Sequence, residues 1–96
     1  MNDRIDAAIL ALNARLDGAV LDGTAKFVVP GDGAIMVDSA GARAGNEAAD
    51  VTLTADGDVF AAIITGDLDP AAAFMSGKLE IEGDMGLALK LAGALS

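Results

Sequence analysis

Residues 49–66 read ADVTLTADGDVFAAIITG, and this stretch contains a change of hydrophobic period. In residues 49–55 apolar side chains alternate with polar ones, which is the pattern of a β-strand with one buried face. After the turn-forming run Asp56-Gly57-Asp58, apolar residues follow helical spacing up to Ile64, and Gly66 ends the run. The stretch therefore predicts a strand followed by an amphipathic helix.

Upstream of this stretch, the pattern predicts a helix and a β-hairpin. Apolar residues recur at helical spacing from Asp3 to Asp17, and from Ala19 to Val29 they alternate with polar ones. Pro30 and the glycine-containing turn after it lead into a second strand at residues 34–38. Residues 42–46 are a candidate for a short edge strand in the loop that follows.

Downstream, the pattern predicts a helix, a strand and a last helix. Asp69 and Pro70 are suited to the start of a helix that ends near Gly77. Residues 78–82 alternate again and predict a strand with one apolar face. The apolar residues between Met85 and Leu95 predict the final helix.

This order of elements predicts a single small α+β domain spanning residues 1–96. We expect a mixed, mostly antiparallel sheet of four to five strands covered by helices. The 22 residues from Asp56 to Gly77 are long enough for a helical crossover. We therefore expect strands 49–55 and 78–82 to run parallel, with a right-handed connection between them.

The composition disfavours several classes of function. The chain has no Cys and no His, which removes thiolate and imidazole catalysis and the usual zinc ligands. Its net charge of −9 disfavours binding to nucleic acid and to anionic membranes. The longest apolar runs have six residues, against roughly 20 for a membrane span, and residues 1–4 do not resemble a secretory signal. We expect a cytoplasmic, acidic, non-catalytic protein with no cofactor and no stable membrane insertion.

Two acidic pairs and one glycine-containing turn each have a ligand-binding and a structural interpretation. The pairs Asp56/Asp58 and Asp67/Asp69 lack the further oxygen ligands of a calcium loop, and their positions favour helix capping. The turn Gly83-Asp84-Met85-Gly86 opens a helix and could hold a phosphate, but it lacks the lysine of a P-loop and places a carboxylate at the site. We therefore expect a tight strand-to-helix turn there and no metal site.

The apolar faces of the last three predicted helices also have two interpretations. In the first, these faces simply pack on the sheet. In the second, the helices stand away from the sheet and enclose an apolar cavity. Met75 and Met85, which flank the predicted strand 78–82, would be adaptable lining residues for such a cavity.

Residues 74–91, FMSGKLEIEGDMGLALKL, resemble the signature of the sterol carrier protein type 2 domain family. Residues 49–54 and 65–73 are similar to the same family in order and spacing. The resemblance implies a small α+β domain with an apolar tunnel that binds fatty acids, fatty acyl-CoA or sterol-like lipids. The lining residues that it implies are Phe74, Met75, Met85 and Leu89, followed by Phe27, Ile63 and Ile64.

The sequence is therefore compatible with two functions. The first is intracellular binding or transfer of a small hydrophobic ligand without catalysis. The alternative is an accessory module that presents an apolar face to a protein partner in lipid or quinone metabolism. An internal cavity in the structure would favour the first function, and an external apolar patch would favour the second.

Overall fold

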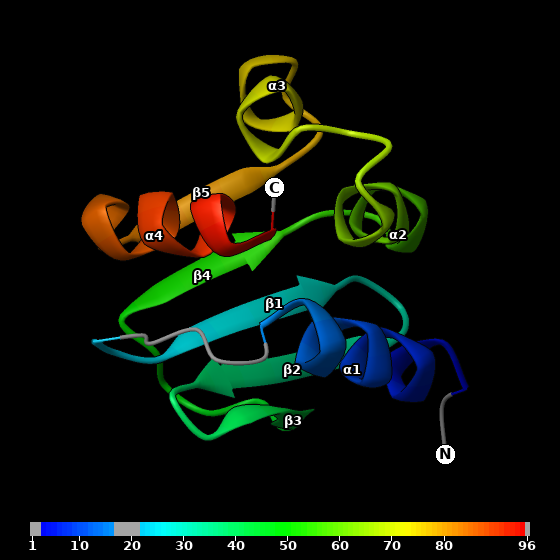
Figure 1. Cartoon of the computed structure of the whole chain (residues 1–96), viewed down its shortest axis with the longest axis vertical. Helices are drawn as coiled ribbons and strands as arrows, with labels where there is room; N and C mark the ends of the chain where they lie inside the picture. The colour runs from blue at the N-terminus through cyan, green and yellow to red at the C-terminus, as the bar shows by residue number, and fades with distance from the viewer. Residues whose placement is uncertain (1–2, 17–21, 96) are drawn as a thin grey trace.

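The computed structural model describes residues 3–16 and 22–95, which form five strands and four helices (Figure 1). In chain order these are α1 (Asp3–Arg15), β1 (Ala25–Val29), β2 (Gly33–Asp38), β3 (Gly41–Ala44), β4 (Val51–Thr54), α2 (Gly57–Thr65), α3 (Pro70–Met75), β5 (Glu80–Gly83) and α4 (Met85–Leu95). The fold is α+β, as the sequence predicts.

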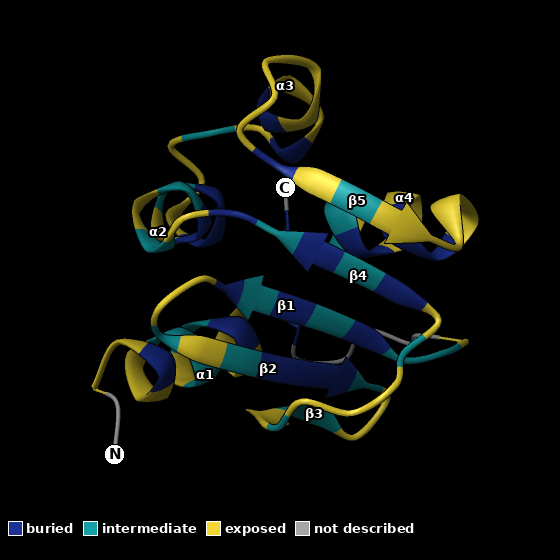
Figure 2. Cartoon of the chain, turned by 180° about the vertical axis from the view of Figure 1, so that it is seen from behind, coloured by how far each residue is buried: buried dark blue, intermediate teal, exposed yellow. Residues whose placement is uncertain are grey.

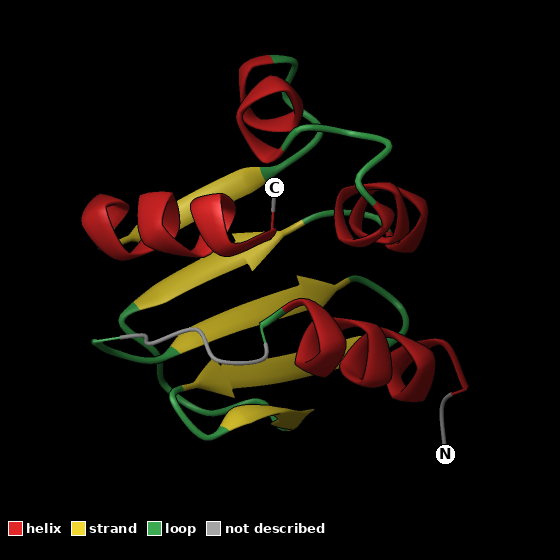
Figure 3. Cartoon of the chain, in the orientation of Figure 1, coloured by secondary structure: helices red, strands yellow, loops and turns green. Residues whose placement is uncertain are grey.

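The five strands form one mixed sheet in the order β3-β2-β1-β4-β5 (Figure 3). β1 and β4 are parallel, and the other neighbouring pairs are antiparallel. Phe27 lies opposite Leu53, and Leu53 lies opposite Ile81. Side chains at paired positions point to the same face of a sheet, so this register places three large apolar residues side by side.

The helices lie over this apolar face of the sheet. α1 packs on β2 and β3, α4 packs on β4 and β5, and α2 lies against α1 (Figure 1). α3 protrudes at one end of the molecule, beside the start of β5 (Figure 1). No helix in the described part of the chain is long and apolar enough to span a bilayer.

The opposite face of the sheet is partly covered by the segment that joins β3 to β4 (Figure 2). Gly45 passes so close to the sheet that a Cβ atom there would lie 2.9 Å from Cγ of Met36, whose side chain is buried. Lys26 Nζ donates a hydrogen bond of 3.1 Å to the Asn46 side-chain oxygen. This segment returns the chain to the start of β1, where the Asp50 amide donates to the Thr24 carbonyl oxygen at 2.9 Å.

The predicted parallel pairing of strands 49–55 and 78–82 is wrong. β4 and β5 are antiparallel, with Thr54 opposite Glu80 and Val51 opposite Gly83. The reason is that α2 and α3 leave the sheet at the end of β4 and return the chain to that same end (Figure 1). The parallel pair is β1 with β4, because the β2–β3 hairpin and the segment after it carry the chain back to the start of β1.

Most predicted elements are confirmed, and several of their bounds differ by a few residues from the prediction. Of the strand expected from Ala19 to Val29, residues 22–24 are not in the sheet, and β1 begins at Ala25. Ala25 pairs with Val37, next to the last residue of β2, and with Val51, the first residue of β4. The expected edge strand is β3. The predicted end of the first helix at Asp17 and the predicted start of the next strand at Ala19 lie outside the described residues.

The predicted helix caps are only partly confirmed. Asp56 and Asp69 occupy the N-cap positions of α2 and α3, but neither carboxylate forms a capping hydrogen bond. Both residues are exposed, and water can satisfy the first N–H groups of an exposed helix. The Asp84 carboxylate accepts a hydrogen bond of 3.1 Å from the Leu87 amide, so residues 83–86 form the expected strand-to-helix turn.

Replacing Gly83 by Ala should destabilise the fold strongly. Gly83 has φ +111°, and a Cβ atom there would lie 2.3 Å from the carbonyl oxygen of Asp50. Gly77→Ala is the matched control, because Gly77 has φ +78° with nothing within 4 Å of the added carbon. We expect a loss of at least about 3 kcal/mol in the free energy of unfolding for Gly83→Ala and about 1–2 kcal/mol for Gly77→Ala. Urea denaturation measures both, and equal losses would contradict the close approach at Gly83.

Candidate functional site

An apolar pocket lies between the helices and the β1–β4–β5 part of the sheet. Its cavity volume is about 190 Å³. The sixteen residues that line it are all apolar: Phe27, Leu53, Phe60, Ile63, Pro70, Ala71, Phe74, Met75, Leu79, Ile81, Met85, Ala88, Leu89, Leu91, Ala92 and Leu95. Such a surface interacts with a ligand through hydrophobic burial and shape, since it offers no polar side chain to bind a head group.

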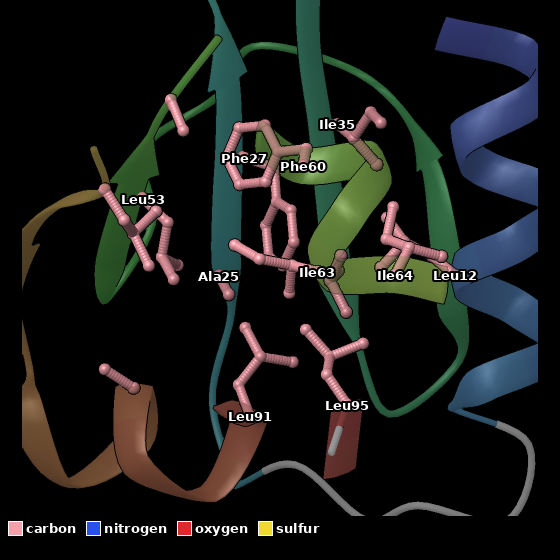
Figure 4. Packing of buried hydrophobic residues seen from close by; sticks show 14 of the residues in the cluster. Leu12, Ala25, Phe27, Ile35, Leu53, Phe60, Ile63, Ile64, Leu91 and Leu95 are labelled. Atoms are coloured by element: carbon pink, nitrogen blue, oxygen red, sulfur yellow. The ribbon is translucent and has the colours of Figure 1, made fainter. Parts of the chain in front are cut away.

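The closed end of the pocket is formed by buried side chains from the sheet, α2 and α4. Phe27 and Phe60 stack with ring centroids 5.1 Å apart and ring planes at 24° (Figure 4). Leu91 and Leu95 extend from α4 toward this part of the core (Figure 4). These residues are almost fully buried, so the same side chains stabilise the fold and form the deep wall of the pocket.

The open end of the pocket is formed by exposed side chains from α3 and α4. The exposed fractions are 44% for Phe74, 85% for Met75, 45% for Met85 and 70% for Leu89. These four residues both line the pocket and face solvent. The pocket is therefore a cleft whose mouth has an apolar rim.

The structure brings six of the seven sequence-predicted lining residues to this pocket: Phe27, Ile63, Phe74, Met75, Met85 and Leu89. Ile64 is the exception, because it lines a different groove between α1 and α2. Ile63 and Ile64 are consecutive on α2, so their side chains are about 100° apart around the helix axis. That these residues contact a lipid stays a prediction.

Sequence reasoning missed several lining residues. On α4, Met85, Ala88, Leu89 and Ala92 follow the i, i+3, i+4, i+7 spacing of one helix face, so the helical pattern contained the signal for Ala88 and Ala92. Leu53 and Ile81 come from two strands, and their proximity depends on the register of β4 against β5. Because the sequence analysis paired these two strands in the wrong direction, it did not place Leu53 next to Ile81.

The groove between α1 and α2 has a larger volume, about 420 Å³, but a less apolar surface. Its alanine-rich lining also includes Arg4, Asp32 and Asp58. Arg4 and Asp32 form an ion pair with a distance of 3.7 Å between Nη1 and Oδ2. Placing an alkyl chain against charged groups would remove water from them at a cost. The smaller, wholly apolar pocket is therefore the stronger candidate site.

Charged groups near the pocket lie outside its lining. Lys90 is the one charged residue of α4, and its ammonium group contacts the Asp22 carboxylate. The hydrogen bond from Lys90 lowers the pKa of Asp22, and the same bond raises the pKa of Lys90. Both groups therefore keep their charge at neutral pH. Within residues 3–16 and 22–95, no cluster of three or more acidic residues could hold a metal ion.

Comparison with known proteins identifies the family. A profile described as the SCP-2 sterol transfer family matches residues 3–96. The chain belongs to this family. Its structure is similar to the crystal structure of Sterol Carrier Protein 2 Like 2 from Aedes aegypti, with a TM-score of 0.80, 29% identity and 95% coverage of each chain. This SCP-2 family assignment confirms both the sequence resemblance and the fold class.

Two further proteins are similar to this chain. The solution structure of palmitated SCP2L2 from Aedes aegypti has a TM-score of 0.73 and 28% identity, covering 99% of this chain and 95% of that one. Hydroxysteroid dehydrogenase-like protein 2 from Xenopus tropicalis is 58% identical over 43 residues, which are 45% of this chain and 10% of that protein. The chain thus spans about a tenth of the length of this protein and of two similar curated relatives.

The methionines of the chain should differ in their reactivity toward hydrogen peroxide. Thioether oxidation requires access of the oxidant to sulfur. We expect Met75 and Met85 at the pocket mouth to form sulfoxide at least tenfold faster than Met36, whose exposed fraction is 1%. Peptide mass spectrometry over a time course measures the three rates in one sample. Equal rates for Met36 and Met75 would contradict this arrangement.

Proposed function

We propose that this domain binds single-chain lipids non-covalently, with the alkyl chain in the apolar pocket and the head group at its mouth. The observation that carries the proposal is the uniformly apolar lining of the pocket. Membership of the SCP-2 sterol transfer family supports lipid binding. The palmitated relative, which shares 28% of its residues with this chain, supports an acyl chain as the ligand.

Among fatty acids, fatty acyl-CoA and sterol-like lipids, we favour a ligand whose buried part is a slender alkyl chain. The cavity volume of about 190 Å³ is below the roughly 300–1,000 Å³ of pockets that enclose drug-sized molecules. A flexible chain can enter a narrow cleft progressively, whereas a rigid ring system requires the full width at once. Because no polar residue lines the pocket, we expect weak discrimination between head groups.

We further propose that the domain itself is non-catalytic. None of the lining side chains is a nucleophile, a general acid or base, or a metal ligand of the common kinds. The longer relatives matched by part of this chain include a protein named as dehydrogenase-like. In our proposal the domain described here supplies lipid binding, and any reaction belongs to other parts of such proteins.

The alternative function, an accessory module that binds a protein partner, also has one observation in its favour. Four large apolar side chains are exposed together at the pocket mouth. A partner could cover them without any ligand in the pocket. The two functions predict different results when the pocket is closed. Closing the pocket abolishes lipid binding, whereas the external apolar face stays available to a protein partner.

Ala71→Trp should close the pocket mouth and weaken lipid binding. Ala71 is exposed and lines the pocket, whereas its neighbour Ala72 is also exposed but does not line the pocket. We expect at least a tenfold loss of affinity for a fluorescent fatty acid in Ala71→Trp and less than a twofold change in Ala72→Trp. Titration of each purified variant measures the affinity. Full affinity in Ala71→Trp would count against this pocket as the binding site.

Ligand binding should also stabilise the fold, because Phe27, Leu91 and Leu95 belong both to the pocket lining and to the core. A ligand at 100 times its Kd that binds only the folded state adds about 2.7 kcal/mol, which is roughly 10–20 °C in Tm for a domain of this size. We expect this rise when palmitate is added to delipidated protein in a thermal scan. The Ala71→Trp variant should show a much smaller rise, and no rise in the unsubstituted protein would contradict the proposal.

A further inference from the structure

The groove between α1 and α2 has the size of a small-molecule site. Its volume of about 420 Å³ lies within the roughly 300–1,000 Å³ of pockets that enclose small ligands. Its floor is apolar and consists of four buried residues: Ile5, Val29, Phe60 and Ile64. Figure 4 shows Ile64 extending from α2 toward α1. One turn of an α-helix about 10 Å wide and about 5.4 Å long already fills this volume, so the groove fits a small molecule better than a partner helix.

The groove has two different ends, because α1 and α2 lie against each other and run in the same direction. At the helix starts, Asp32 Oδ2 lies 3.7 Å from Nη1 of Arg4, and a Cβ atom at Gly57 would lie 3.7 Å from the same oxygen. At the helix ends, Arg15 Nε donates a hydrogen bond of 2.7 Å to the Ile64 carbonyl oxygen. The charged residues of the groove therefore gather at the helix starts, and Arg15 ties the helix ends together.

The walls of the groove between its two ends consist of small apolar side chains. These are Ala7, Ala8 and Ala11 from α1 and Ala61 from α2. Alanine leaves room above the buried floor and offers only a methyl group to an occupant. Because the floor and the walls are both apolar, an occupant of this middle part needs an apolar body.

The charged end of the groove has an excess of negative charge. Its lining includes two carboxylates, those of Asp32 and Asp58, and one guanidinium, that of Arg4. Arg4 forms its ion pair with Asp32, whereas the exposed Asp58 carboxylate forms no ion pair within residues 3–16 and 22–95. A cation at this end would be attracted, and an anion would be repelled both by the groove and by the net charge of −9.

We propose that this groove is a second ligand site, which binds a small amphiphilic amine with a compact apolar body and one ammonium group. The body lies on the apolar floor between the alanines, and the ammonium group lies beside Asp58. An ammonium group is a donor of three hydrogen bonds, and those to a carboxylate are stronger than bonds between neutral groups. Phe60 is the one described residue that lines both this groove and the apolar pocket. The amine site is therefore distinct from the proposed lipid site and does not depend on it.

Titration with tryptamine tests the proposal directly. The chain has no Trp and no Tyr, so the fluorescence anisotropy of the added indole reports binding without a background from the protein. We expect saturable binding of tryptamine. Indole-3-propionate has the same ring and linker but carries a carboxylate in place of the ammonium group, and we expect it to bind at least tenfold more weakly.

Two pairs of variants test the charged end and the apolar middle separately. Asp58→Asn should weaken tryptamine binding at least fivefold, and Asp56→Asn less than twofold, because Asp56 is also exposed but does not line the groove. Both variants change the net charge of the chain equally. Ala61→Leu fills the groove and should weaken binding at least tenfold. Ala14→Leu is its control, since Ala14 is an exposed helix residue outside the groove and should leave the affinity unchanged.

Several outcomes would overturn the proposal. These are no saturable binding of tryptamine, equal affinity for tryptamine and indole-3-propionate, equal losses in Asp58→Asn and Asp56→Asn, or full affinity in Ala61→Leu. Amide chemical shifts in NMR spectra locate the bound tryptamine: we expect changes on α1 and α2, and changes centred on α4 would assign tryptamine to the apolar pocket instead. Because these measurements use no lipid, the amine site and the proposed lipid binding can each fail independently of the other.

Discussion

The stacked contact between Phe27 of β1 and Phe60 of α2 packs α2 against the apolar face of the sheet. The chain has three Phe and no Trp or Tyr, so this contact uses two of its three aromatic rings. Phe60 lines both the apolar pocket and the groove between α1 and α2. Its ring is therefore part of the wall between the two spaces, and the position of α2 decides which residues face each of them.

The pocket depends on a contrast in side-chain size around this contact. Phe27, Leu91 and Leu95 fill the core, whereas Ala71, Ala88 and Ala92 in the lining occupy little volume. Alanine leaves space and contributes little apolar burial, so the larger residues must supply the stability of a small domain. In the proposed function, ligand binding and folding therefore use the same side chains.

The distribution of charge separates the surface into two regions. The net charge of −9 arises from acidic residues on strands, loops and helix starts, while α3 and α4 are nearly free of charge. The four exposed apolar residues at the pocket mouth, Phe74, Met75, Met85 and Leu89, lie in the region with almost no charge. The pocket therefore opens on the part of the surface that is both apolar and nearly uncharged.

Much of the fold could be predicted because periodicity is local. The helix near the start, the β1–β2 hairpin, the short helix after Asp69 and the helix after Asp84 each follow from the spacing of a few apolar residues. The direction of β5 could not be predicted, because 22 residues suffice either for a crossover or for a return to the same end of the sheet. The alternation of apolar and polar residues in this strand is the same whether it runs parallel or antiparallel to β4.

The sequence by itself determined the class of the fold, the absence of Cys and His, the strong acidity and the family. These are properties of composition, local spacing and motif. Only the tertiary structure decided that Ile63 faces the pocket and Ile64 the groove, and that Met75 and Leu89 remain exposed at the mouth. The physical reason is that a helix face acquires its role from the element packed against it, and that packing depends on contacts distant in the chain.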